Sequence, residues 1–375
     1  MDDFYSSFDA KIQTDVGVLD FSRAFDTVPH QRLIGKLAHY GIQGSTLSWI
    51  EAFLTGRSMQ VIVDGEASDS APVTSGVPQG SVLGPLLFNL FINDMPDVVT
   101  NGTSIRLFAD DCLAYREIRT PEDQVILQGD RTRLQQWAAL WGMKFNPAKC
   151  NIIHIARTKP MTKFYELCGQ VLSAVDSAKY LGITITSDLR WHEQTSAAVK
   201  NANSALHMVT RNLRHCPRST RATAYLTLVR PKLEYCASVW DPHTQEDVHT
   251  LEMVNRRAAR SVYKKSWRQQ DVSPTTLLQE LGWPTLQERR QRLRLCMMYK
   301  ICNGLVAVPP SRLTQPARVT RGHSKKFCVL RSTCEVVRNS FYVRSIPQWN
   351  NLNERTVSAC PLAVFKTELL DSASA

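Results

Sequence analysis

Two adjacent aspartates, Asp110 and Asp111, interrupt an apolar segment and carry the strongest chemical signal in the chain. The residues on either side have the alternation of two strands, so the Asp pair is predicted to lie in the turn of a hairpin. Neighbouring carboxylates repel and shift each other's pKa, so little is gained from the arrangement unless a cation lies between them. Hard oxygen ligands of this kind suit Mg²⁺ or Mn²⁺.

A third carboxylate, Asp20, ends a short apolar segment at residues 16–21. If that strand lies beside the hairpin, Asp20 and Asp110 could share two metal ions. Two-metal sites of this kind stabilise the attacking and the leaving oxygen of a phosphoryl transfer. Taken one at a time, an Asp-Asp turn and an Asp helix cap are the more ordinary interpretations. The case for a metal site therefore rests on what accompanies the three residues.

A loop punctuated by Gly and Pro at residues 75–80 runs into an apolar segment that predicts a helix over residues 81–94. Glycine allows the backbone to approach a ligand closely, and the amides at a helix N-terminus favour phosphate. A glycine-rich loop alone is a weak signal. The whole string between Asp20 and the Asp pair is a strong one.

Five segments, in order, resemble the palm motifs of reverse transcriptases from non-LTR retrotransposons, close to jockey-like elements. They are residues 19–28, 76–81, 108–111, 146–150 and 180–183. The resemblance implies an α+β right-hand polymerase fold, with an antiparallel palm sheet, packed helices and an α-helical thumb. The domains expected from it are a palm over residues 1–187, a thumb over 188–270 and a basic C-terminal region, helical and irregular, over 271–375.

The resemblance also implies an activity, which is RNA-directed DNA polymerisation with two Mg²⁺ or Mn²⁺ ions. Asp20, Asp110 and Asp111 match the catalytic carboxylates, and the backbone carbonyl of Phe21 would help to hold one metal. Lys149 matches the lysine proposed as general acid for the pyrophosphate. An ordinary surface lysine is the competing interpretation of Lys149.

Nucleotide selection is implied for four further residues. Phe25 matches the aromatic position that excludes a ribose 2′-hydroxyl by a steric clash, although it could be an ordinary core aromatic. Pro78, Gln79 and Gly80 would line the incoming nucleotide and the template base. The implied partners are an RNA template, a DNA primer and dNTPs, with work in the nucleus and no membrane.

Charge is unevenly distributed along the chain, whose formal net charge is +11. Residues 1–100 carry five Lys and Arg against twelve Asp and Glu, whereas residues 201–375 carry twenty-seven against twelve. A basic half is typical of a surface that follows a phosphate backbone. The predicted nucleic-acid-binding stripe consists of Arg256, Arg257, Arg260, Lys264 and Lys265.

Apolar periodicity predicts the elements that would position these residues. Helices are expected over residues 29–40, 45–54, 121–141, 195–213, 219–239, 245–265 and 274–303. Strands are expected over residues 60–66, 150–155 and 178–186. The ten cysteines show no C-x-x-C pair, which favours free thiols over a zinc site. Trp349 could stack on a base, although packing in a small C-terminal core is the more ordinary interpretation.

Only nineteen residues precede Asp20, so a fingers region and an upstream endonuclease are not expected in this chain. Two other functions therefore stay open. One is a catalytically dead, truncated copy that acts only as a basic nucleic-acid-binding protein. The other is an RNA-dependent RNA polymerase or a telomerase-type enzyme, which would use the same carboxylates. Phe25 and residues 77–80 make this function less favoured.

Overall fold

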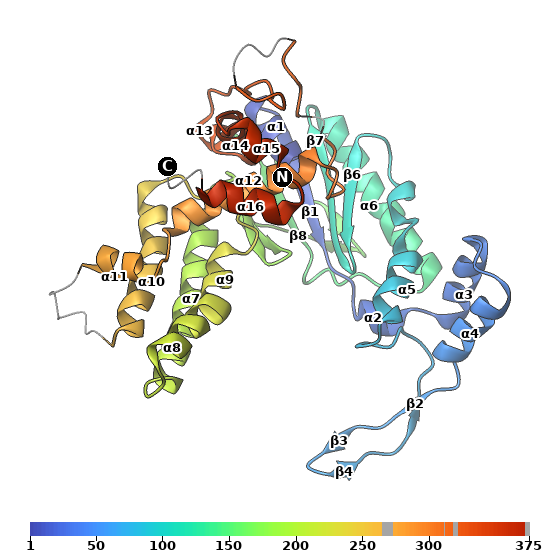
Figure 1. Ribbon diagram of the computed structural model, residues 1–375. Helices are drawn as coiled ribbons and strands as arrows, with labels where there is room; N and C mark the ends of the chain where they lie inside the picture. The colour runs from blue at the N-terminus through green and yellow to red at the C-terminus, as the bar shows by residue number, and fades with distance from the viewer. Residues whose placement is uncertain (265–272, 311, 318–321, 372–375) are drawn as a thin grey trace. The chain divides into compact units, whose positions relative to one another are not determined.

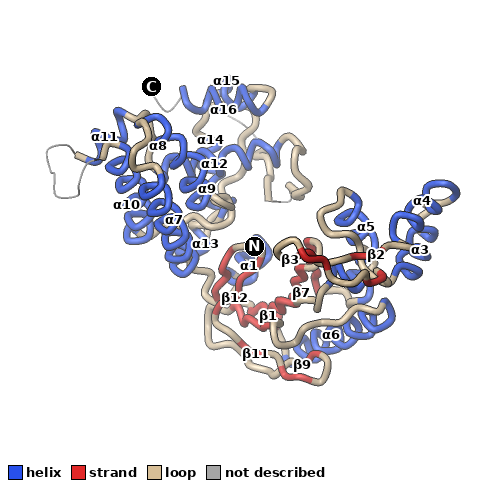
Figure 2. The backbone as a smooth tube through the Cα atoms, turned by 90° about the horizontal axis from the view of Figure 1, so that it is seen from below, coloured by secondary structure: helices blue, strands red, loops and turns tan. Residues whose placement is uncertain are grey.

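The computed structural model describes residues 1–264, 273–310, 312–317 and 322–371 (Figure 1). The chain divides into two compact units. The sheet unit is Ala10–Gly182, and the helical unit combines Met1–Asp9 with Ile183–Ala375. Figure 2 shows that the strands belong mostly to the sheet unit. The domain limits expected at residues 187 and 270 stay predictions.

A five-stranded sheet forms the centre of the sheet unit. Its spatial order is β11 (Ser173–Ala174), β8 (Asn151–Ile155), β1 (Gln13–Leu19), β7 (Asp111–Ile118) and β6 (Thr103–Phe108). All neighbours pair antiparallel except β11 with β8, which are parallel. The predicted α+β class, with an antiparallel sheet and packed helices, is confirmed.

Helix α6 (Pro121–Trp141) covers this sheet, and its predicted limits are confirmed. The helix begins at a capping box between Thr120 and Asp123 and ends where Gly142 adopts a left-handed conformation with φ 76°. Both signals are local in the sequence, which is why the limits could be predicted. Apolar side chains of α6 join the core beneath the sheet, including Leu127, Leu134 and Trp137.

Asp15 lies on β1 and is fully buried, unlike Asp20 a few residues later. Its carboxylate accepts hydrogen bonds from Tyr165 Oη at 2.5 Å and pairs with His154 Nδ1 at 2.7 Å. The guanidinium of Arg131 lies 4.0 Å from the ring centroid of Tyr165. These partners hold β8 and α6 against β1, so Asp15 has a structural role.

The remaining elements of the sheet unit are short. The helices are α2 (Ala24–Thr27), α3 (His30–His39), α4 (Gly44–Leu54), α5 (Leu83–Ile92) and the 3₁₀ helix η1 (Met95–Val98). An arm that is exposed along most of its length (Figure 1) pairs β2 (Ser58–Met59) with β5 (Ala71–Pro72) and β3 (Ile62–Val63) with β4 (Glu66–Ala67). The other strands are β9 (Glu166–Leu167), β10 (Gln170–Val171) and β12 (Ser177–Tyr180).

Two strand predictions need correction. The strand expected over residues 60–66, entering an Asp-Gly turn, forms only the two residues of β3. The expected turn is confirmed, since Asp64 and Gly65 both have positive φ between β3 and β4. The strand expected over 178–186 is two strands, because Leu181 and Gly182 adopt φ of 46° and 77° and break it. Gly182 adopts this conformation readily, but positive φ is rare for leucine, so the left-handed conformation of Leu181 could not be predicted.

The regular elements of the helical unit are helices, apart from one short strand, and long loops connect some of them. Its elements are α1 (Asp2–Asp9), β13 (Ile183–Thr186), α7 (His192–Asn212), α8 (Arg218–Ala224), the π-helix η2 (Tyr225–Val229), α9 (Arg230–Glu234), α10 (Gln245–Val262), α11 (Pro274–Glu280), α12 (Leu286–Cys302), α13 (Glu335–Arg338), α14 (Phe341–Asn350), α15 (Glu354–Ser358) and α16 (Leu362–Asp371). Residues 1–9 pack here through Tyr5, which accepts a hydrogen bond from Trp191 at 3.1 Å.

Three helix predictions in this unit are partly wrong. The helix expected over residues 219–239 contains the π-helix before Pro231 and ends at Glu234. The helix expected over 245–265 ends at Val262. The helix expected over 274–303 is broken between Glu280 and Leu286.

Trp349 is fully buried in a small C-terminal core, so its interpretation as a packing residue is confirmed. All ten cysteines are free thiols. No described helix has the length and apolar character needed to cross a bilayer.

Candidate active site

The strand register brings the predicted carboxylates to one end of the sheet. Leu19 pairs with Cys112 across β1 and β7, so Asp20 and Asp111 follow and precede that pair on neighbouring strands. Phe108 pairs with Asp111, which leaves a two-residue turn in which Ala109 has φ 51°. Asp110 therefore lies in the turn of the hairpin, as predicted, whereas Asp111, which was expected in the same turn, is the first residue of β7 because it pairs with Phe108.

Negative charge is concentrated at this end of the sheet. Desolvation raises the pKa of Asp111 above its ordinary value, and the carboxylates of Asp110 and Asp20 raise it further. Within the described part of the chain, none of the three Asp side chains forms an ion pair. The site thus has an excess of negative charge that a bound cation would neutralise.

The donor chemistry suits a hard cation, because all three side chains offer carboxylate oxygens. Among the described residues, however, no three His, Cys, Asp or Glu side chains are placed so that together they could hold a metal ion. Phe21, the fourth predicted contributor, bridges to Phe145, and their rings stack at 4.3 Å. The residues therefore suit a divalent cation by the chemistry of their carboxylate oxygens, while their side chains do not converge on one point in this structure.

The backbone of Asp20 is held by the segment that follows α6. Its N–H donates to Cys150 Sγ at 3.3 Å, and its carbonyl accepts from the N–H of Asn146 at 2.8 Å. Burial raises the pKa of Cys150 to about 11, so the thiol stays neutral beside the carboxylate. Sequence reasoning missed the role of Cys150, although it ends the fourth motif.

Lys149 lies in an exposed turn, where its N–H donates to the carbonyl of Asn146 at 3.0 Å. It is adjacent in sequence to Cys150, which contacts Asp20, and therefore lies on the segment that supports the site. None of the ion pairs found in the described residues joins its ammonium to a carboxylate. Its assignment as a general acid stays a prediction.

The second motif is fastened to the first by backbone hydrogen bonds. The N–H of Gly76 donates to Val28, and that of Val77 donates to Phe25, each at 2.8 Å. Gly76 has φ 92°, and a Cβ there would lie 2.8 Å from the Cα of Asp26. Only glycine permits this close contact, which explains its place in the motif.

Gln79 is exposed, and its Nε2 donates to the Oδ1 of Asp26 at 2.8 Å. Ser81 donates to the carbonyl of Pro78 at 2.7 Å and accepts from Gly84 N–H, which fixes the loop where α5 begins. Gly80 is exposed with φ 80°. Sequence reasoning missed Asp26, although it lies within the first motif.

A pocket of about 650 Å³ opens beside this loop. Gln79, Pro78 and Asp26 line it, together with the cationic side chains Arg23 and Arg57. The pocket therefore joins the two motifs and offers positive charge beside them. Such a surface suits a phosphate-bearing ligand.

Phe25 is half-buried and stacks on Phe88 of α5, with ring centroids 4.3 Å apart and an interplanar angle of 19°. Its ring packs against the core of the sheet unit and is also partly exposed. This geometry is compatible with both interpretations of Phe25. The packed part of the ring suits a core aromatic, and the exposed part could exclude a ribose 2′-hydroxyl by a steric clash.

The predicted basic stripe lies on and just after α10. Arg257 and Lys264 are exposed, whereas Arg256 and Arg260 are half-buried. Lys265 lies outside the described residues. These four described cations form a surface that could follow a phosphate backbone, and the assignment stays a prediction.

Other arginines of the helical unit form buried ion pairs around Asp241, which we name the Asp241 cluster. Arg290 Nε donates to Asp241 at 2.8 Å, Arg344 Nη1 lies 3.0 Å from the same carboxylate, and Arg294 pairs with it as well. Arg289 pairs with Glu234. Much of the basic excess on α12 is therefore structural.

Comparison with known proteins is consistent with the motifs. Residues 8–185 match the reverse transcriptase (RNA-dependent DNA polymerase) family. Over that span, just under half of the chain, the sequence is similar to a reverse transcriptase domain, and its relatives are RNA-directed DNA polymerases of jockey-like, non-LTR retrotransposons. The matched span contains the sheet, the carboxylate hairpin and the second-motif loop.

The relatives are polymerases of mobile elements. A probable RNA-directed DNA polymerase from transposon BS of Drosophila melanogaster is 28% identical, over 76% of this chain and 32% of the relative. The RNA-directed DNA polymerase from the mobile element jockey of the same species is 27% identical, over 70% of this chain and 30% of the relative. The chain thus spans about a third of the length of these curated relatives.

Among solved structures, a telomerase from Candida tropicalis, in complex with a fragment of telomeric RNA, is 9% identical. The match covers 79% of this chain and 45% of that chain, with a TM-score of 0.40.

Proposed function

We propose that this chain catalyses RNA-directed DNA synthesis, adding dNTPs to the 3′-hydroxyl of a DNA primer on an RNA template. The observation that carries the proposal is the placement of Asp20 beside the Asp110–Asp111 hairpin, where no Lys, Arg or His of the described residues pairs with the three carboxylates. The match of residues 8–185 to the reverse transcriptase family supports it.

Asp20 and Asp110 would hold two divalent cations, Mg²⁺ or Mn²⁺, with help from Asp111 and the carbonyl of Phe21. When bound, such ions activate the attacking oxygen and stabilise the leaving oxygen. Reverse transcriptases generally use divalent metal ions, which agrees with this donor set.

The chain's own residues supply position and charge. The bonds from the second motif to Phe25 and Val28 fix the loop that would contact the nucleotide. Gln79, oriented by Asp26, would face the base pair that forms. Holding the reacting groups in one geometry removes most of the entropic barrier to transfer. Lys149 would give a proton to the departing pyrophosphate.

Primer extension tests the assignment directly. The purified chain is given an annealed RNA template and DNA primer, dNTPs and Mg²⁺ or Mn²⁺. Asp110→Asn should lower extension by about a thousandfold or more, because the developing charge loses its counter-ion. Binding of template–primer should stay nearly unchanged. The control is Asp176→Asn, which removes an exposed carboxylate elsewhere in the sheet unit and should keep full extension.

Extension retained by Asp110→Asn would overturn the site assignment. If the wild-type chain binds template–primer in a salt-sensitive way but adds no nucleotide, the chain is a nucleic-acid-binding protein without polymerase activity.

Sugar selection gives a second test. If Phe25 is the wall that excludes a 2′-hydroxyl, Phe25→Val should raise incorporation of ribonucleotides relative to dNTPs by about tenfold or more. Phe88→Leu, which changes the ring beneath it, is the matched control for loosened packing. Equal ribonucleotide use by the wild-type chain would point to an RNA polymerase instead.

A further inference from the structure

A pocket of about 370 Å³ lies in the helical unit, bordered by α12, the end of α14 and α16. Its apolar wall consists of Leu295, Leu352 and Leu369. Pockets that bind small organic ligands commonly have volumes of about 300–1,000 Å³ and a mainly apolar lining with a few polar groups. This pocket reaches the lower end of that range.

The polar side of the pocket is rich in amides, from Gln291, Gln348 and Asn351. Gln348 is oriented from behind, because its Oε1 accepts a hydrogen bond from Arg294 Nη2 at 3.0 Å. Arg294 is only 2% exposed and is itself held by Asp241. With its oxygen occupied, Gln348 presents its NH₂ group, which has no partner among the described residues.

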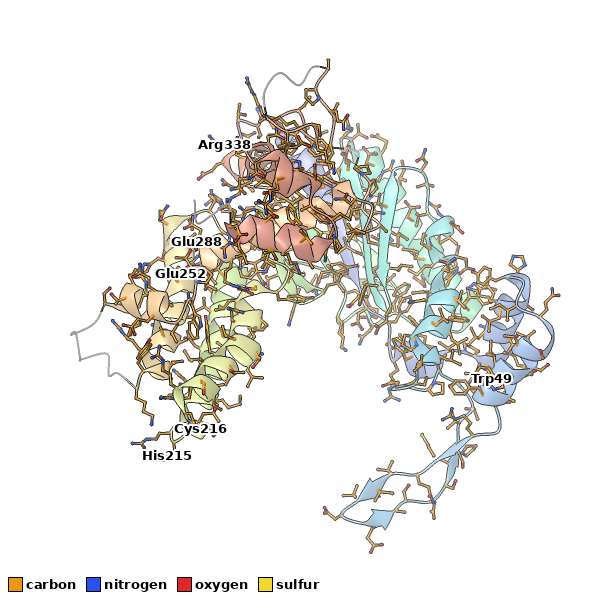
Figure 3. All side chains as sticks on the ribbon, in the orientation of Figure 1. Trp49, His215, Cys216, Glu252, Glu288 and Arg338 are labelled. Carbon is orange, nitrogen blue, oxygen red and sulfur yellow. The ribbon has the colours of Figure 1, made fainter. Side chains whose placement is uncertain are left out.

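The pocket is lined by one negative and one positive side chain, so its formal net charge is zero. Glu288, labelled in Figure 3 near the start of α12, and Arg292 both line it. Neither side chain forms an ion pair within the described residues. A pocket with one free carboxylate and one free guanidinium does not favour an anion such as phosphate. It favours a neutral ligand whose edge has both donors and acceptors.

A nucleobase has these properties. Gln and Asn side chains match the donor–acceptor pair of adenine, Arg matches guanine, and a carboxylate accepts from an exocyclic amino group. Leucine side chains offer apolar contact to the ring faces. Sequence-selective recognition of RNA depends on single-stranded bases that leave the stack.

We propose that this pocket binds one unstacked base of single-stranded RNA, in a way that does not depend on the basic stripe of α10. The proposal rests on the proposed function, which brings RNA to this chain. It gives the C-terminal region a role in choosing the RNA.

The first experiment titrates the full chain with adenosine, guanosine, cytidine and uridine, which carry no phosphate, and follows binding by ligand-observed NMR. The second measures the affinity for a single-stranded RNA at about 0.5 M salt, where phosphate contacts are weak. The test variants are Gln291→Leu, which removes an amide, and Leu352→Trp, which fills the pocket. Gln287→Leu is the matched control, because Gln287 is equally exposed on α12 and does not line the pocket.

We expect one or two nucleosides to bind, and both test variants to weaken nucleoside and high-salt RNA binding by about tenfold. Gln287→Leu should bind as the wild-type chain does. Absence of binding for all four nucleosides would overturn the proposal, as would equal binding by wild type and Gln291→Leu, whose exposed position leaves folding intact. Because the titration needs no polymerisation, a chain that fails primer extension can still pass or fail this test.

Discussion

The molecule contains two clusters of like-charged side chains. In one of them the fold supplies an opposite charge, and in the other it does not. The carboxylate site places Asp20, Asp110 and Asp111 at strand ends with no cation. The Asp241 cluster gathers three guanidiniums around one carboxylate, and Arg290 and Arg294 are each only 2% exposed.

The two clusters differ in whether each charged side chain has partners that offset the cost of its desolvation. Arg290 donates to the carbonyls of Leu233 and Trp240 and lies 3.9 Å from the ring centroid of Trp240. Burial lowers the pKa of Arg290 and of Arg294 to about 9, which still leaves both protonated at neutral pH. Charges that receive such partners are structural, whereas the uncompensated carboxylates are poised for a cation from outside.

The same substitution in both clusters should therefore have very different effects on folding. Asp241→Asn leaves buried guanidiniums without their counter-charge and should lower the free energy of unfolding by about 3–5 kcal/mol. Asp110→Asn relieves repulsion at a partly exposed turn and should change it by less than about 0.5 kcal/mol. Urea denaturation followed by tryptophan fluorescence measures both.

Arg355→Gln is the control for an exposed ion pair, since Arg355 is 80% exposed beside Glu368. Its effect should stay below about 1 kcal/mol. An Asp241→Asn variant as stable as this control would show that the cluster does not hold the helical unit together.

A smaller loss is expected for Arg344→Gln. Arg344 is the most exposed of the three guanidiniums, at 19%, and donates to the Asp241 carbonyl at 3.2 Å. The carboxylate keeps Arg290 and Arg294 in the variant, so we expect a loss of about 1–2 kcal/mol in the same denaturation experiment. A loss equal to that of Asp241→Asn would mean that Arg344 is the main partner.

A small effect of the opposite sign is expected at Asp111. Its pKa is raised in the fold, so ionisation of Asp111 destabilises the folded state at pH values above that pKa. Asp111→Asn should therefore raise the Tm by about 1–2 °C at neutral pH without metal. The advantage should vanish as the pH falls through the pKa of Asp111.

Addition of Mg²⁺ provides the matching test by calorimetry. A cation that binds the folded carboxylates raises the Tm of the wild-type chain more than that of Asp111→Asn. Equal shifts in both proteins would place the cation elsewhere.

The sequence predicted the features that depend on neighbouring residues. The hairpin around Asp110 and the limits of α6 follow from strand alternation, a Thr-Pro start and a Gly end. The bond between Gln79 and Asp26 was not predictable, because 53 residues separate them and only the folded chain brings them together.

The arginines of α12 show a second limit of prediction from the sequence, which concerns the burial of charged residues. Alternating basic residues are typical of an exposed helix face, yet Arg290 and Arg294 are buried. Their burial depends on Asp241, about fifty residues earlier, and no local pattern marks that residue as their partner. The pattern of charge along a helix therefore does not distinguish its exposed arginines from its buried ones.

The position of helix α1 in the chain affects how it can fold during synthesis on the ribosome. Asp2 and Asp9 are synthesised about 300 residues before their hydrogen-bond partners Arg312 and Ser332. At roughly 5–20 residues per second, α1 waits on the order of 15–60 s for them. Throughout that delay the apolar face of α1, with Phe4 and Phe8, depends on other protection, and the sheet unit that follows α1 is fully synthesised before the partners emerge.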